Sequence, residues 1–217
     1  MSLNSQTARI PSPGGMALDH VARWRMTGIG LLRIVFGAIW AVDAYFKWLP
    51  DFHNNLDDYL TGAAKDQPAA VQAWIGFWIN TVGVNPHAFG YAIAAAETAV
   101  ALGLIFGVLS NLTNIGGALL SLVIWSTAEG FGGPYRAGST DVGAAVIYVL
   151  VFAGLFLASA GLYLGFDRRC TLALGRFGFL ASGPLEATTA ASPNGLPNGQ
   201  SRRRDEVVPP IGSHRPA

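Results

Sequence analysis

The 217-residue chain has few of the residues on which disulfide, metal and haem chemistry depend. It has one cysteine, Cys170, which excludes an intramolecular disulfide, a CxxC redox pair and a thiolate metal cage. Its four histidines lie outside the apolar core runs, which excludes a haem held by two histidines inside a helical bundle; they are His20, His53, His87 and His214. We expect no bound metal and no bound cofactor, so any electron carrier would be a partner or a diffusible quinone.

Charged residues are also scarce. They make up 12% of the chain and give a net charge of +1, which offers no reason to expect nucleic acid as a partner. Hydrophobic residues make up 51%, and the mean hydropathy is +0.38. This composition is too apolar for an ordinary soluble domain and indicates a membrane protein that contacts lipid.

The apolar runs predict an all-α protein, an integral four-helix membrane bundle. About 20 helical residues cross the hydrocarbon core of a bilayer. Spans are expected near 27–49, 88–109, 112–128 and 141–165. Residues 1–26 lack the apolar core of a cleavable signal, so we expect the first span to stay in the mature protein.

The basic residues predict the orientation of the bundle. Arginines gather before the first span and after the fourth, whereas the outer loops contain Lys65 and Arg136. Both termini of this multi-pass protein are therefore expected on the cytoplasmic side. Residues 168–181 form a juxtamembrane segment, and the composition of 182–217, rich in Pro, Gly, Ser, Thr, Asn and Arg, predicts a disordered cytoplasmic tail.

The loop after the first span contains a further helical pattern. Its apolar residues recur at helical spacing at Val71, Trp74, Ile75, Trp78 and Ile79. Tryptophans prefer the headgroup level, so this pattern predicts an outer interfacial helix that covers the bundle. The alternative is a helix that packs on the outer loop without lipid contact.

Ionisable residues inside two apolar runs are the most informative feature. They are Arg33, Asp43 and Lys47 in the first run and Glu97 in the second. An ionised side chain at membrane depth costs at least about 2.5 to 3.5 kcal/mol, so it is retained where it has a partner, water or a function. At about 100° per residue, Arg33, Trp40, Asp43 and Lys47 share one stripe, which must face protein or water.

This set has two interpretations. In the structural one, Arg33 pairs with Glu97, and Asp43 pairs with Lys47 one turn further along the same helix. In the functional one, the four residues line a polar pocket open to the outer half of the bundle, and Trp40 helps to hold a planar ring. Glu97 and Asp43 would then be catalytic groups that transfer protons, and Arg33 and Lys47 would bind quinone or anionic oxygens.

A second polar group is expected at the outer mouth, in the Gly- and Pro-rich loop before the fourth span. Tyr135, Arg136 and Asp141 are candidate substrate-binding residues there, because the fixed fork of arginine donors suits an oxyanion. The structural alternative is that Asp141, beside Ser139 and Thr140, caps the following helix. Tyr135 and Arg136 would then anchor the loop at the headgroups.

Short motifs in these runs resemble the DoxX-like membrane proteins over about residues 28–167. They are Leu31-Leu32-Arg33, Phe36-Gly37, and Glu97 in an Ala-rich run followed by Gly103 and Gly107. The segment from Gly138 to Tyr148 is similar to the DoxD branch, the membrane subunit of thiosulfate:quinone oxidoreductase. The resemblance implies an inner-membrane four-helix domain over 27–167 and, in that branch, electron transfer from thiosulfate to quinone with a companion subunit.

Three functions remain open. The first is the membrane subunit of a redox complex that passes electrons from a thiosulfate-like compound or a partner enzyme to quinone. The second is a non-catalytic scaffold for soluble redox enzymes, and the third is a small-solute carrier. A companion redox subunit is an expected partner, and a homo-oligomer is a further possibility.

Overall fold

The computed structural model describes residues 13–137, 139 and 141–182, and within them every regular element is helical. The α-helices are α1 (Pro13–Lys47), α2 (Pro50–Asn54), α3 (Leu56–Ala64), α4 (Ala69–Gly83), α5 (Pro86–Phe106), α6 (Ser110–Ser126), α7 (Ala144–Leu157) and α8 (Asp167–Leu174). Three short 3-10 helices join them, at Gly130–Gly132, Ala160–Leu162 and Gly175–Leu180. The predicted all-α class is confirmed for this part of the chain.

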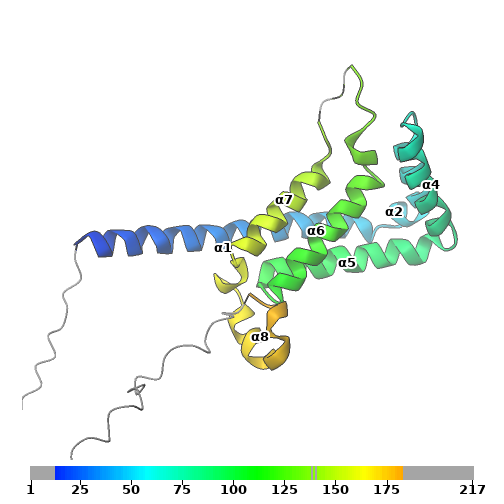
Figure 1. Ribbon diagram of the computed structural model, residues 1–217. Helices are drawn as coiled ribbons and strands as arrows, with labels where there is room; N and C mark the ends of the chain where they lie inside the picture. Colours follow the sequence, from blue (N-terminus) through cyan, green and yellow to red (C-terminus); the bar gives the residue numbers. More distant parts are fainter. Residues whose placement is uncertain (1–12, 138, 140, 183–217) are drawn as a thin grey trace, which may run out of the picture. The chain divides into compact units, whose positions relative to one another are not determined.

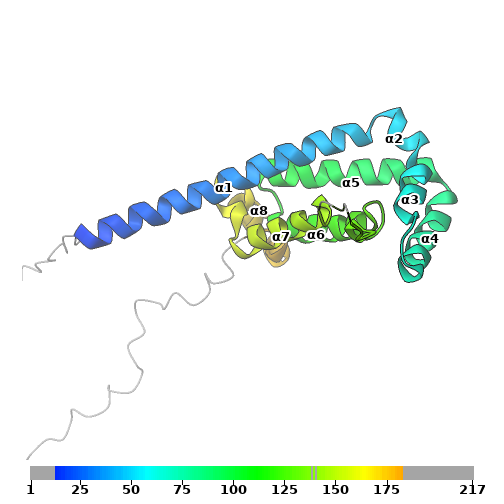
Figure 2. The ribbon, with the colours of Figure 1, turned by 90° about the horizontal axis from the view of Figure 1, so that it is seen from above.

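Four of these helices form a bundle. α1 and α5 run antiparallel side by side, and α6 and α7 pack against each other as a second pair inclined to the first (Figure 1). A view from above shows the second pair beside α5 (Figure 2). Their common core consists of Phe36 and Trp40 from α1, Val100, Ala101 and Leu104 from α5, Phe152 and Leu155 from α7, and Ala160.

Edge-to-face aromatic contacts join α1 to α7. The rings of Phe36 and Phe152 lie 5.0 Å apart, and those of Trp40 and Phe152 lie 5.3 Å apart, both in edge-to-face geometry. Such pairs contribute about 0.5–1.5 kcal/mol beyond the area they bury. Gly117 of α6 makes room for this cluster, because a Cβ there would overlap the Phe152 ring.

Helices α2, α3 and α4 form a cap at the end of the bundle where α1 ends and α5 begins (Figures 1 and 2). The cap has its own apolar cluster, formed by Leu56, Leu60, Ile75 and Val82, against which Phe89 and Ile93 of α5 pack. The pattern over Val71–Ile79 therefore forms a helix, as predicted. Its buried side faces α3, while Trp74 and Phe77 are exposed.

Residues at both ends of α5 explain where this helix starts and stops. The side chain of Asn85 accepts a hydrogen bond from the Ala88 amide, and Pro86 occupies the first turn. At the other end Gly107 adopts the left-handed conformation, with φ of 60°, and closes the helix. Residues 107–109 form the short turn that joins α5 to α6.

Among the described residues, two helical segments are long and apolar enough to cross a membrane, Arg23–Lys47 and Pro86–Phe106. α6 has 17 residues and α7 has 14. At about 1.5 Å per residue α7 is about 21 Å long, against about 30 Å for the hydrocarbon core.

The helix expected over 141–165 is therefore shorter than predicted. Gly143, with φ of 91°, precedes its first turn, and Ser159, with φ of 49°, follows its last. Neither residue has helical backbone angles, so the apolar residues from Ala160 to Leu164 form a 3-10 turn and an irregular segment.

The two ends of the chain also differ from expectation where they are described. The first helix begins at Pro13 and not near residue 27, and the segment 168–181 is largely helical. Ser182 is buried, and its amide donates to Asp167 Oδ2 at 2.6 Å, so the predicted tail does not begin there. The rest of that tail, 183–217, lies outside the described residues.

Candidate functional site

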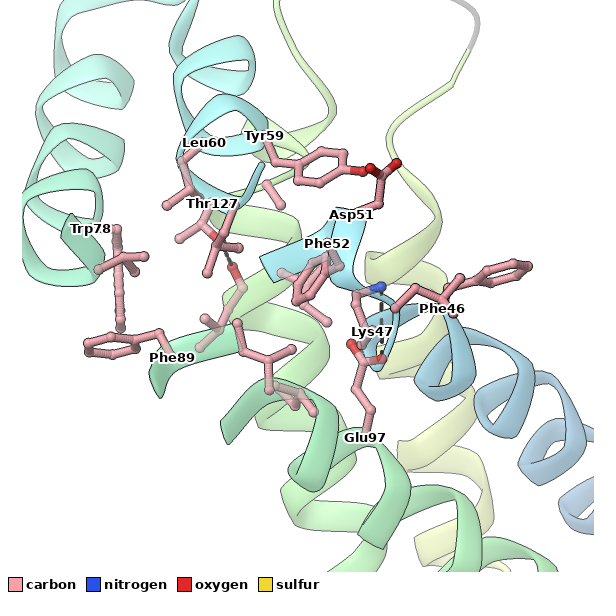
Figure 3. A pocket seen from close by; sticks show the side chains of 18 residues that line it. Phe46, Lys47, Asp51, Phe52, Tyr59, Leu60, Trp78, Phe89, Glu97 and Thr127 are labelled. Atoms are coloured by element: carbon pink, nitrogen blue, oxygen red, sulfur yellow. Dashed lines mark hydrogen bonds and ion pairs between the residues drawn. The ribbon is translucent and has the colours of Figure 1, made fainter. Parts of the chain in front are cut away.

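A hollow lies between the bundle and its cap. It has a volume of about 500 Å³ and is bounded by the end of α1, by α2, α3 and α4, and by α5 and α6 (Figure 3). Large aromatic and aliphatic side chains form its wall, including Phe46, Phe52, Tyr59, Trp78 and Phe89. We refer to it below as the cap cavity.

Lys47 and Glu97 form the polar floor of the cap cavity. Lys47 is the last residue of α1, and its Nζ lies 3.9 Å from Oε2 of Glu97, which lies midway along α5 (Figure 3). Glu97 is 2% exposed, and its Oε2 accepts no hydrogen bond from any described residue. The ion pair therefore leaves a carboxylate oxygen with unused hydrogen-bonding capacity beside an apolar hollow.

Two aromatic residues of the cap add to the polar character of this hollow. Lys47 Nζ lies 5.1 Å from the centre of the Phe52 ring, within the range of a cation–π contact. Trp78 also lines the cavity, and its buried indole Nε1 has no hydrogen-bond partner among the described residues. The cap cavity thus has an ammonium group at its floor and an unpartnered indole N–H buried in its wall, among aromatic and aliphatic side chains.

The structure brings together two of the predicted site residues, Lys47 and Glu97, and separates the others from them. Asp43 lies one turn before Lys47 on α1, is half-buried, and does not line the cap cavity. The lysine pairs with Glu97, so the expected pairing of Asp43 with Lys47 is not the one found. Trp40 is 2% exposed and belongs to the bundle core, so its predicted contact with a ligand ring is wrong.

Arg33 has a structural role that the sequence did not predict. Its Nη1 donates to the carbonyl oxygen of Leu104 and, at 3.4 Å, to that of Ile105. Its Nη2 donates to the carbonyls of Tyr163 and Leu164 at 3.2 and 3.0 Å. These backbone carbonyls take the place of the expected pairing with Glu97, and the fully buried guanidinium does not line the cap cavity.

The carbonyls that Arg33 binds explain this placement. The last four carbonyls of a helix have no donor within the helix, and a cation is favoured at that end by the helix dipole. Leu104 and Ile105 lie in the last turn of α5, and Phe106 O accepts from the amide of Phe166 at 3.1 Å. Arg33 therefore satisfies the end of α5 and ties it to the segment after α7.

The outer-loop residues Tyr135 and Arg136 lie at a different hollow. It has a volume of about 480 Å³, is lined also by Asp66, Gln67 and Phe131, and shares no lining residue with the cap cavity. Arg136 pairs with the Asp66 carboxylate at 3.7 Å and donates to the Asp66 carbonyl at 2.8 Å. The hydroxyl of Tyr135 donates to Phe131 O at 2.6 Å, so both residues hold the loop in place.

Asp141 and Glu129 both serve the start of α7. Asp141 Oδ1 accepts from the Gly143 amide at 2.9 Å, which agrees with the structural alternative for this residue. Glu129 accepts from the Ala145 amide at 3.2 and 3.1 Å through its two carboxylate oxygens. A carboxylate at a helix N-terminus satisfies free amides and complements the dipole.

Sequence reasoning missed two further groups. The aromatic residues Phe52, Tyr59 and Phe89 of the cavity wall were not singled out, because the cavity that they line exists only once the cap folds onto α5. Asp167 is fully buried and accepts from the amides of Ser110 and Ser182. Its position at the start of α8, before two arginines, was the one available signal.

Among the described residues, no three His, Cys, Asp or Glu side chains lie close enough to hold a metal ion. Comparison with family models, with curated proteins and with solved structures finds no match for this chain.

Proposed function

We propose that this chain is a multi-pass membrane protein whose cap cavity binds the ring of a quinone, and that it serves as the quinone-facing subunit of a redox complex. The observation that carries the proposal is the ion pair of the partly exposed Lys47 with the buried Glu97, at the floor of a cavity walled by aromatic and aliphatic side chains. The volume of about 500 Å³ falls in the range of about 300–1,000 Å³ that is usual for ligand pockets.

The polar groups of the cavity suit the chemistry of a quinone. A quinone ring is planar and has two carbonyl oxygens on opposite sides, so it needs an aromatic wall and two hydrogen-bond donors. Lys47 Nζ would donate to one carbonyl, and a rotation of the Trp78 side chain would bring its unpartnered indole N–H to the other. Aromatic side chains such as Phe52 and Phe89 would pack on the ring faces.

Reduction of a quinone to a quinol takes up two electrons and two protons. Glu97 lies next to the lysine that would bind the carbonyl, so it would deliver one proton to that oxygen. Asp43, half-buried one turn before Lys47, would return a proton to Glu97, and the second proton would reach the other carbonyl oxygen from water. The electrons would come from a thiosulfate-like compound or a companion enzyme, as the resemblance to the DoxD branch implies.

The membrane placement in this proposal rests on the two long apolar helices and on the distribution of arginines. α1 and α5 would span the inner membrane, with both chain termini on the cytoplasmic side. The cap and the loop that holds Tyr135 and Arg136 would then lie on the outer side, close to a donor or a companion subunit. Trp74 and Phe77 of α4 are exposed, as expected for a helix at the lipid headgroups.

Quinone titration of the full chain in detergent tests the proposal, with tryptophan fluorescence as the readout because Trp78 lines the cavity. We expect saturable quenching, and about tenfold weaker binding after Lys47→Met, since a hydrogen bond from a charged group is lost. Lys65→Met is the matched control, because Lys65 is an exposed lysine that does not line the cavity. Absence of saturable binding, or equal effects of the two substitutions, would contradict the proposal.

One observation favours the scaffold as a second candidate. Arg33, which the redox hypothesis placed in the site, binds four backbone carbonyls and has a purely architectural role. A scaffold would show the same pattern at Lys47 and Glu97: their substitution would change stability and leave ligand binding unaltered. The titration above separates these outcomes.

A further inference from the structure

An apolar groove lies next to the cap cavity, between α5 and α6, and has a volume of about 580 Å³. Leu120 lines both the groove and the cap cavity. On α5, the groove residue Ala96 directly precedes the cavity residue Glu97. The two hollows therefore adjoin at Leu120.

Small residues leave this groove empty. Ala96, Ala99 and Gly103 line it from α5, and Gly116 lines it from α6. Ala96 and Ala99 are exposed, and a Cβ at Gly116 would meet no atom within 4 Å. Exposed leucines border the groove, Leu102 at 50% and Leu112 at 48%, as expected for a surface that faces lipid chains.

We infer that the ligand of the cap cavity has a long hydrocarbon tail, and that the tail lies in the α5–α6 groove while the ring occupies the cavity. This inference rests on the proposed quinone function and specifies its substrate class as a membrane quinone with an isoprenoid tail. Three observations support it: the shared wall of the two hollows at Leu120, the apolar lining of the groove, and the exposed leucines that border it.

The groove would stabilise the bound tail through close packing and not through the hydrophobic effect. A tail in a bilayer is already surrounded by hydrocarbon, so only its closer packing against the groove can favour the bound state. Many weak dispersion contacts along Ala99, Gly103 and Gly116 would supply this preference. Filling the groove should then weaken binding of a tailed quinone without changing binding of its ring.

The experiment uses the full chain in one detergent and two probes, a tailless dimethoxy-methyl-benzoquinone and the same ring with a decyl tail. The test variant is Gly116→Leu, which places a side chain in the groove. The matched control is Gly154→Leu on α7, because Gly154 is exposed and a Cβ there also meets open space. Detergent partitioning of each probe is identical for all three proteins, so it cancels in the comparison.

Gly116→Leu is expected to weaken binding of the decyl quinone by about tenfold through lost dispersion contacts. Binding of the tailless ring should stay within about twofold of that of the unsubstituted chain, since the cavity itself is intact. Gly154→Leu should change neither. Equal effects of the two leucines on the decyl probe would overturn the inference while leaving the ring site in place. Failure of the tailless ring to bind the unsubstituted chain would overturn the proposed function and, with it, this inference.

Discussion

Lys47 and Glu97 come from different helices, and their Nζ and Oε2 atoms lie 3.9 Å apart. Lys47 is the last residue of α1, whereas Glu97 is in the middle of α5, so the end of α1 stops halfway along its neighbour. The rest of α5 is covered by the cap, with α2, α3 and α4 all packing on it. The cap cavity exists because of this offset between the two long helices.

The Lys47–Glu97 pair should show strong energetic coupling. Lys47→Met leaves the buried Glu97 carboxylate without a cation and should lower the free energy of unfolding by about 3 kcal/mol. Glu97→Gln removes the buried charge that needs a partner, so it should lower the free energy of unfolding by less than Lys47→Met does. The double variant should be more stable than Lys47→Met alone. Unfolding in mixed detergent micelles measures all three, and additive effects would contradict the coupling.

Arg33→Met should destabilise the bundle by about 3 kcal/mol, because buried carbonyls at the end of α5 would lose their donors. Arg33→Lys keeps the charge but lacks the planar guanidinium that reaches four acceptors. Its stability should therefore lie between that of Arg33→Met and that of the unsubstituted chain. Thermal unfolding in detergent orders the three proteins. An Arg33→Met variant as stable as the unsubstituted chain would show that the hydrogen bonds from Arg33 to the four carbonyls are dispensable.

Glu129→Ala should loosen the start of α7. The carboxylate accepts from the Ala145 amide, and loss of a helix cap costs about 1 kcal/mol. Hydrogen exchange at that amide should accelerate, while the middle of α7 should keep its protection. Glu129→Gln retains an acceptor oxygen and serves as the control, with a smaller change. Unchanged exchange in Glu129→Ala would assign the cap to another group.

Gly90→Ala should disturb the packing of α2 on α5, because a Cβ at this position would overlap the buried ring of His53. We expect a loss of about 2 kcal/mol from overpacking. Combining it with His53→Ala should recover part of that loss, since the overlapping ring is gone. Gly83→Ala is the matched control, because a Cβ there meets open space. A Gly90→Ala chain that melts together with Gly83→Ala would refute this packing.

The helices were predictable from the sequence to the extent that local signals mark their ends. Asn85, Pro86 and Gly107 are recognisable start and stop residues, and α5 was expected within a few positions of its observed bounds. The predicted helix over 141–165 was longer than the observed α7. The helix ends before Ser159, which has a left-handed backbone conformation, and no glycine or proline at that position marks the end in the sequence. An apolar run gives the composition of a helix but not its length.

The site was predictable only in part, for a related reason. Charges at Lys47 and Glu97 are visible as breaks in apolar runs, and the structure brings both to one cavity. The acceptors of Arg33 are backbone carbonyls, which every residue has, so no sequence pattern distinguishes them. A charged side chain in an apolar run reveals that it needs a partner without revealing that the partner is main chain.

The hydrogen bonds of Arg33 also have a consequence for the order in which the chain folds. Its acceptors lie at residues 104–105 and at residues 163–164, so the last of them is synthesised about 130 positions after the arginine. Until then the guanidinium has no complete set of acceptors and would stay at the water boundary, where long basic side chains are tolerated. Hydrogen bonding between α1 and its neighbours is therefore complete only after the segment that follows α7 has been made.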